Sequence, residues 1–102
     1  MSAQSALDAR RAVDNLTTVV GIELLCGAQA AEFVDRASEL TSVDAPVEHG
    51  IGTAAVYEAV RDVVPPLDDD RPLYEEIDRV DALVSGGLID TVVAKALDEP
   101  LE

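Results

Sequence analysis

The amino-acid sequence predicts an all-α protein in which one long N-terminal helix precedes three shorter helices, as part of a long-helix oligomeric bundle. Three observations predict this class. No proline occurs from residue 3 to about residue 36, apolar residues recur there at steps of three or four, and no segment has a convincing strand pattern. Aromatic residues make up 3% of the chain, so Ala, Val, Leu and Ile supply its apolar content. These residues pack helices closely but fill little volume each, which favours a core shared with neighbouring chains.

The predicted first helix covers residues 3–36, and its apolar character changes along its length. Up to Val20 the apolar residues form one stripe, whereas from Thr17 to Phe33 they surround nearly the whole helix, which predicts burial on all sides. At 1.5 Å per residue this helix is roughly 50 Å long, whereas a domain of about 100 residues has a radius of gyration near 13 Å. We therefore expect it to overhang its own domain and to self-associate through its core residues Val13, Leu16, Val20, Leu24 and Phe33.

The remaining chain divides into a predicted loop, residues 37–52, and a small helical subregion, residues 53–102. The second helix starts at Thr53 and ends before Pro65-Pro66, which cannot continue it. After an acidic turn the third helix carries Pro72 in its first turn and ends at Gly86-Gly87, and a short fourth helix precedes the acidic tail. The apolar stripes of these helices are Val56, Ala59, Val60 and Val63, then Ile77, Val80 and Val84, then Ile89, Val92, Val93 and Ala96.

The charge balance is strongly acidic and excludes several partners. The net charge is −14, from 21 acids and 7 bases. Such a surface repels nucleic acid and anionic membranes. Disorder is a second explanation of the charge, but 48% apolar residues at helical spacing argue against it. Lys95 is the only lysine and arginine supplies the other bases, so the composition resembles the proteins of salt-loving archaea.

Cysteine content and hydropathy predict a cytoplasmic chain. Cys26 is the only cysteine, so an intrachain disulfide is impossible, and no signal-peptide pattern is present. The longest apolar stretch, residues 19–34, is interrupted by glycine and by polar or charged residues. A membrane span needs about 20 apolar residues with few or no charges, so we expect a buried helix of a soluble protein and no membrane.

The candidate reactive residues form no recognisable catalytic group. One histidine and one cysteine exclude a zinc cluster, and Asp68–Asp70 lacks the spacing of a calcium loop. His49 is predicted to be a solvated loop residue with no orienting partner, and Cys26 a buried small apolar residue. Glu23, inside the apolar stretch, is expected to pair with arginine or backbone donors across a helix interface, the alternative being a catalytic role. We assign no catalytic, cofactor-binding or metal-binding residue.

Three stretches resemble, in order along the chain, consecutive segments near the C-terminus of the histidine ammonia-lyases. None of them is a catalytic motif, so the resemblance rests on their collinear order and on matching helix and loop lengths over essentially the whole chain. The stretches are residues 14–30 (DNLTTVVGIELLCGAQA), 52–67 (GTAAVYEAVRDVVPPL) and 70–77 (DRPLYEEI).

The resemblance implies that residues 1–102 are the C-terminal helical segment of a lyase that eliminates ammonia from L-histidine to give urocanate, in histidine degradation. It also implies an L-aspartase-like homotetramer built on a central bundle of very long helices. The electrophile of the family is a methylidene-imidazolone formed from an Ala-Ser-Gly tripeptide, which this chain lacks. Met1 matches the last residue of the family motif Gln-Glu-Asp-His-Val-Ser-Met, and Tyr57 and Tyr74 do not match its catalytic tyrosines. We therefore expect the chain alone to be structural and inactive.

Two alternatives stay open at this stage. The chain could be a stand-alone acidic helical interaction module that self-associates or joins a separate lyase chain. Alternatively the parent enzyme could be a related aromatic amino-acid lyase that acts on Phe or Tyr, because the preference for histidine rests on the resemblance alone.

Overall fold

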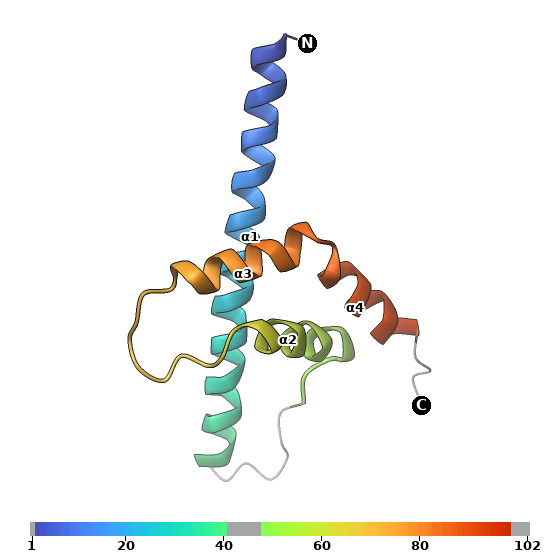
Figure 1. The fold of residues 1–102 in the computed structure, drawn as a ribbon. Coiled ribbons are helices and arrows are strands. Elements are labelled where there is room, and N and C mark those ends of the chain that lie inside the picture. Colours follow the sequence, from blue (N-terminus) through green and yellow to red (C-terminus); the bar gives the residue numbers. More distant parts are fainter. Residues whose placement is uncertain (1, 41–47, 99–102) are drawn as a thin grey trace.

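The computed structural model describes residues 2–40 and 48–98. Within these residues the chain forms four α-helices and no strand, which confirms the predicted all-α class (Figure 1). The predictions for residues 41–47 of the loop and for the acidic tail lie outside the described residues. The helices are α1 (Ala3–Leu40), α2 (Ile51–Val63), α3 (Tyr74–Ser85) and α4 (Leu88–Asp98).

The length of helix α1 is close to the longest dimension of the whole molecule. Its 38 residues correspond to about 57 Å at 1.5 Å per residue, and the molecule measures 60 × 39 × 19 Å. The radius of gyration is 16.8 Å, against about 13 Å for a compact domain of this size. The first part of α1, the arm (residues 3–16), projects away from the other helices (Figure 1), and every arm residue is exposed. The predicted overhang is therefore confirmed, and it lies at the N-terminal end.

The two ends of α1 have different origins. Ser2 caps the start, because its Oγ accepts a hydrogen bond from the Ser5 amide at 3.1 Å. At the other end the prediction of a stop near Arg36 was wrong by about a turn. The sequence contains neither proline nor glycine between Arg36 and Leu40, so nothing there ends the helix.

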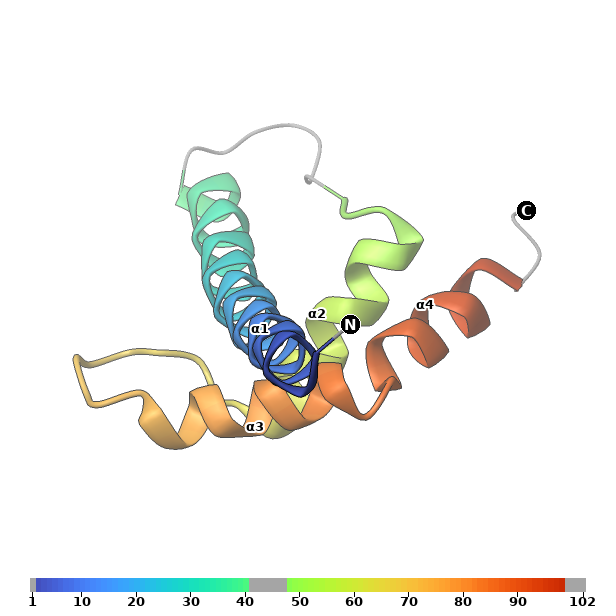
Figure 2. The ribbon, with the colours of Figure 1, turned by 90° about the horizontal axis from the view of Figure 1, so that it is seen from above.

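Helix α3 crosses α1 at Gly21, and this crossing positions the core. A Cβ added at Gly21 would lie 3.4 Å from the Asp81 amide nitrogen and 3.6 Å from the Val80 Cβ. Beside the crossing, the Thr18 hydroxyl donates a hydrogen bond of 2.8 Å to Asp81 Oδ1. Figure 2 looks down α1 and shows α2, α3 and α4 gathered on one part of its circumference. The buried cluster between the helices is Ala28, Val60, Val64, Val80 and Leu83.

The three short helices begin and end close to the predicted residues, with small differences. Helix α2 begins at Ile51, two residues earlier than predicted, with Gly50 as its N-cap, and it ends at Val63 as expected before two prolines. Helix α3 begins at Tyr74, so Pro72 precedes the helix and is not in its first turn. It ends at Ser85 with Gly86 as its C-cap, and Gly87 follows with φ of 77°, a conformation that glycine adopts readily.

Glu76 is a buried acid in the first turn of α3. Arg71 Nε donates a hydrogen bond of 3.2 Å to its Oε1, and the guanidinium also donates to the Pro65 carbonyl at 3.4 Å. A hydrogen bond from its own backbone and, next in size, the bond from Arg71 lower the pKa of the Glu76 carboxyl from its ordinary value of 4.5.

This arrangement predicts how Glu76 affects stability at different pH values. Since the folded-state pKa is lowered, the ionised group stabilises the fold above about pH 4.5, and this contribution is lost as the pH falls through the folded-state pKa. We expect Glu76→Gln to be less stable than wild type at pH 7, with a difference that disappears in strong acid. Denaturant unfolding followed by circular dichroism at several pH values measures this. Glu75→Gln, on an exposed neighbour, is the control, and a difference for Glu76→Gln that is independent of pH would contradict the assignment.

Candidate functional site

A half-buried polar network links α1 to α2. Arg61 Nε lies 2.9 Å from Glu32 Oε1, and both side chains are only 13% exposed. The pair is ionic without a well-aligned hydrogen bond, because Arg61 Nε makes none. The Tyr57 hydroxyl donates to the same Glu32 oxygen at 2.8 Å, and the Arg61 guanidinium lies 5.6 Å from the centre of the Tyr57 ring. One carboxylate of α1 thus holds a cation and a hydroxyl that are four residues apart on α2.

Gln29 extends the network to the segment between α2 and α3. Its Oε1 accepts hydrogen bonds from the Leu67 amide at 3.1 Å and from Arg61 at 3.2 Å. Its Nε2 donates to the Leu67 carbonyl at 3.2 Å. One side-chain amide therefore satisfies both backbone groups of Leu67, which fixes the segment after the two prolines against α1.

The network disfavours ionisation of Tyr57. Burial and, second, the hydrogen bond to Glu32 raise the pKa of the Tyr57 phenol above 10.0, while Arg61 acts in the opposite direction. At neutral pH the phenol is a hydrogen-bond donor to a carboxylate that an arginine already neutralises. With the carboxylate of α1 paired to a cation and a hydroxyl of α2, the network has the features of a structural link between the two helices.

None of the four network residues was predicted as part of a site from the sequence. A usable signal existed, because Gln29 and Glu32 are three apart on one helix face and Tyr57 and Arg61 are four apart on another. Two polar pairs on otherwise apolar helices indicate a contact between the helices. The register that joins them is a tertiary property, and the sequence alone does not show it.

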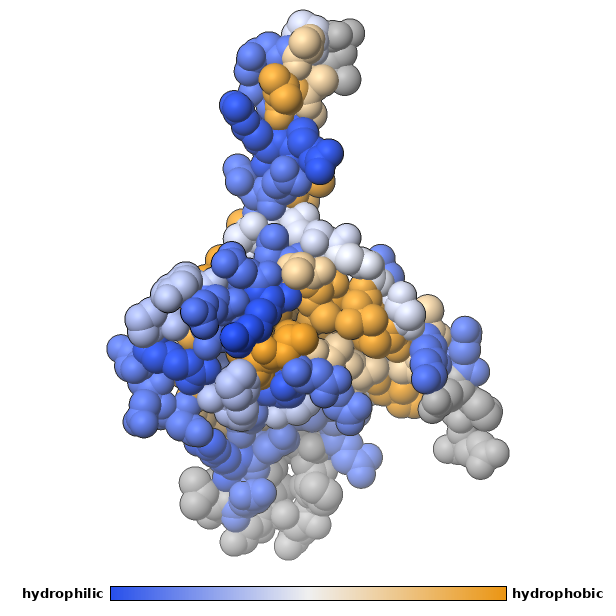
Figure 3. All heavy atoms as spheres, in the orientation of Figure 1, coloured by the Kyte–Doolittle hydropathy of each residue, from blue (hydrophilic) through white to orange (hydrophobic). Residues whose placement is uncertain are grey.

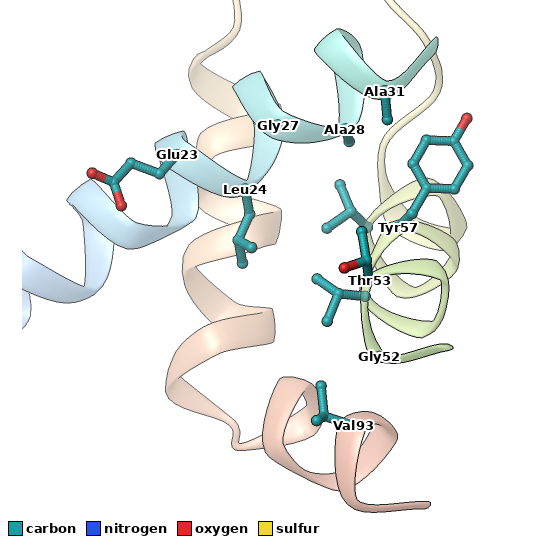
Figure 4. A pocket seen from close by; sticks show the side chains of 11 residues that line it. Glu23, Leu24, Gly27, Ala28, Ala31, Gly52, Thr53, Tyr57 and Val93 are labelled. Carbon is teal, nitrogen blue, oxygen red and sulfur yellow. The ribbon is translucent and has the colours of Figure 1, made fainter. Parts of the chain in front are cut away.

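An open apolar groove lies between α1, α2 and α4. Its volume is about 390 Å³. Figure 4 shows Leu24 and Ala28 on one wall, Val93 of α4 on another, and Glu23 at the margin with its carboxylate turned away from the cavity. The Tyr57 hydroxyl also points away, toward the polar network. Apart from the Thr53 hydroxyl, which Figure 4 shows on the α2 side, the side chains that face the cavity are apolar, so the groove suits an apolar side chain.

Apolar side chains also remain on the surface. On the face shown in Figure 3, hydrophobic residues gather over α2, α3 and α4, and scattered ones lie among hydrophilic residues on the arm. A second open groove, of about 640 Å³, is lined by residues of α2 and α4. Exposed apolar residues at this density indicate a surface that another chain or segment covers. On α1 the large ones are Leu7, Val13, Leu16, Val19, Ile22, Phe33 and Val34.

The predicted self-association set is divided by the structure. Val13, Leu16 and Phe33 are 59%, 61% and 57% exposed and available to a partner. Val20 and Leu24 are half-buried, and Leu24 packs against the core of its own chain. The expectation that α1 is buried on all sides does not hold within this chain. An all-round apolar pattern cannot show which side the chain itself covers, and self-association through these five residues stays a prediction.

Three other residues lie in different surroundings from those predicted. His49 has a partner after all, because its Nε2 lies 3.2 Å from Asp35 Oδ1. Cys26 is exposed and not buried. Glu23 is exposed too, so the expected pairing is not made within the described chain. Asp68 lies in the predicted turn, 3.5 Å from Arg36.

Neither a metal cluster nor a clear membrane segment emerges from the described residues. No group of three or more His, Cys, Asp or Glu side chains in residues 2–40 and 48–98 could hold a metal ion. By length and composition alone, residues 3–37 of α1 could cross a membrane, but the core helix of a soluble protein meets the same criterion. Length and composition therefore do not distinguish a membrane-spanning helix from a soluble core helix for α1.

Comparison with known proteins identifies the class. The family model for aromatic amino acid lyases matches residues 1–62, more than half of the chain. This chain therefore belongs to the aromatic amino acid lyase family. No solved structure matches it.

Within that family, histidine ammonia-lyases are among the similar curated proteins. A probable histidine ammonia-lyase of Halobacterium salinarum is 46% identical over 101 residues, which cover 99% of this chain and 18% of that protein. The histidine ammonia-lyase of Symbiobacterium thermophilum is 37% identical over 102 residues, again 18% of its length. That of Alkaliphilus metalliredigens is 36% identical over 84 residues, 82% of this chain and 15% of the relative. The chain thus spans less than a fifth of the length of these relatives. The resemblance to the histidine ammonia-lyases is confirmed. The match to a Halobacterium protein is consistent with the archaeal origin that the acidic composition predicts.

Proposed function

We propose that this chain is the C-terminal helical segment of a histidine ammonia-lyase, and that the whole lyase eliminates ammonia from L-histidine to give urocanate in the cytoplasm. The identity to proteins of that name over nearly the entire chain supports this proposal, as does the small share of their length that it spans. We assign no catalytic residue to this segment. The Ala-Ser-Gly tripeptide that would form the methylidene-imidazolone is absent from the sequence, so other parts of the lyase would supply the reacting groups.

Within the lyase the segment acts as a structural strut of a homotetramer. The observation that carries this role is the row of large apolar side chains that α1 leaves exposed. Phe33, for example, is 57% exposed. Burying each of the larger side chains would contribute roughly 1.5–3 kcal/mol to assembly. A helix bundle explains these residues better than a membrane, because Glu23 lies inside the apolar stretch.

Two measurements test the proposal. We expect the purified 102-residue chain to self-associate in light scattering or sedimentation and to form no urocanate from histidine. The full-length lyase should form urocanate and should not release ammonia from Phe or Tyr at a comparable rate. Urocanate formation by the 102-residue chain alone would overturn the structural role. Turnover of Phe or Tyr in preference to histidine would overturn the substrate.

A second candidate is a stand-alone interaction module, which the buried cluster around Val60 and Val80 favours because the chain has a core of its own. The coding sequence immediately upstream of Met1 discriminates the two. An in-frame continuation that encodes the Ala-Ser-Gly tripeptide supports the lyase segment, and an in-frame stop codon supports the module.

A further inference from the structure

The exposed side of α1 carries a heptad pattern that differs from the predicted stripe. Eight residues follow one another at alternating steps of three and four, the spacing of a coiled-coil seam. All eight are exposed, and seven of them are apolar or small. We call this set the outer seam: Ala9, Ala12, Leu16, Val19, Glu23, Cys26, Ala30 and Phe33.

The outer seam lies opposite the side that the chain covers itself. Among the α1 residues whose burial is described, Gly21 and Ala28 are the buried ones, and at 100° per residue they lie across the helix from Glu23 and Cys26. Figure 2 shows the other helices on the covered side of α1. Next to the seam, a groove of about 280 Å³ between α1 and the segment after α2 gives room for a partner's side chains.

Charge separates the arm from the rest of the molecule. The arm contains Asp8, Asp14, Arg10 and Arg11, so its net charge is zero. The whole −14 therefore belongs to residues 17–102, which we call the body. Parallel pairing of two seams would bring the acidic bodies side by side and Glu23 against its own copy. Antiparallel pairing would place each neutral arm on the other chain's acidic body and keep the two bodies at opposite ends.

The lengths and the charges together select a register. The arm ends at Leu16. The exposed part of the outer seam that lies on the body runs from Val19 to Phe33, and its length is nearly equal to that of the arm. When Leu16 of one chain meets Val19 of the other, Ala9 faces Cys26 and Ala12 faces Glu23. In this register Arg10 and Arg11 are the partner's bases nearest Glu23, whereas sliding the chains by one heptad would leave that carboxylate opposite Val19.

We propose that the outer seam is occupied by the same seam of a second copy of this chain, antiparallel, with Leu16 opposite Val19 and with Glu23 setting the register. The proposal deepens the proposed function, since it rests on self-association through α1. A single polar residue within an apolar seam commonly fixes register at some cost in stability, and Glu23 is the only one here between Ala9 and Phe33.

Cysteine crosslinking of the complete 102-residue chain tests the register. In Ala9→Cys, the new thiol should form an interchain disulfide with Cys26 of the other copy, found by peptide mass spectrometry after mild oxidation. The same bond cannot form within one chain, because 17 residues of helix separate the two positions by about 25 Å. The matched control is Leu7→Cys, which places the thiol on the arm but away from the seam, and we expect at least about tenfold less crosslinked dimer from it.

The outcomes separate this inference from the proposed function. A chain that dimerises but links Cys26 to Cys26 pairs in parallel, and one that dimerises without the 9–26 bond uses another register; either result overturns the inference and leaves self-association standing. A monomeric chain overturns both. As a second readout, Glu23→Leu in the Ala9→Cys background should still dimerise and should lose the predominance of the 9–26 bond, whereas an unchanged crosslink would show that Glu23 does not set the register.

Discussion

Replacing Arg61 by methionine should destabilise the fold by about 3 kcal/mol, because it leaves the Glu32 carboxylate half-buried without its cation. The loss is large for a small domain, whose total stability is of the order of 5–15 kcal/mol. The variant also removes the donor to Gln29 and the cation above the Tyr57 ring. Denaturant unfolding followed by circular dichroism at constant salt measures the change.

Two further variants make the Arg61 result interpretable. The double variant Glu32→Met, Arg61→Met should recover much of the lost stability, because it removes the unpaired charge together with its partner. Arg79→Met, which breaks the exposed pair between Arg79 and Glu75 on α3, should have little effect. The double variant also loses the hydrogen bond from Tyr57 to Glu32, so recovery need not be complete; no recovery at all would mean that the unpaired carboxylate is not the main source of the Arg61→Met loss.

Local sequence signals were sufficient for the helices. The proline-free run gave α1, Pro65-Pro66 ended α2, and Gly86-Gly87 ended α3, because each signal acts on the backbone of its own neighbourhood. The errors concern places without such a signal. Residues 37–40 contain no breaker, so α1 continued, and Pro72 was compatible with a position ahead of α3 as well as inside it.

The candidate site was harder to predict, because its parts meet only in three dimensions. Glu32 and Arg61 are far apart in sequence, and each one taken alone is predicted to be an exposed charged residue. The exposed position of Cys26 was missed for a related reason. The helix is apolar on all sides near Cys26, so periodicity cannot tell the face that packs on the body from the face left for a partner. The point where α3 crosses α1 resolves this ambiguity, and that point is Gly21.

The second large effect is therefore expected at Gly21. Leucine there should destabilise the chain by about 3 kcal/mol, because its side chain would have to occupy the space of the α3 backbone at Val80 and Asp81. The helices would separate, Val80 would lose part of its complete burial, and the hydrogen bond from Thr18 to Asp81 would break. Unfolding curves at low protein concentration measure the change in the single chain.

The side-chain size at position 21 is the decisive variable, so alanine and leucine should act in opposite directions. An alanine Cβ would meet Asp81 N at 3.4 Å, an ordinary contact, while removing glycine from the helix interior is worth up to about 1 kcal/mol. Gly21→Ala should thus be as stable as wild type or more stable. Gly27→Leu is the matched control on the same helix, since no atom lies within 4 Å of a Cβ there, and it should not destabilise the chain. Equal losses for Gly21→Leu and Gly27→Leu would mean that α3 does not cross α1 at Gly21, and the outer seam would then no longer be the free side of the helix.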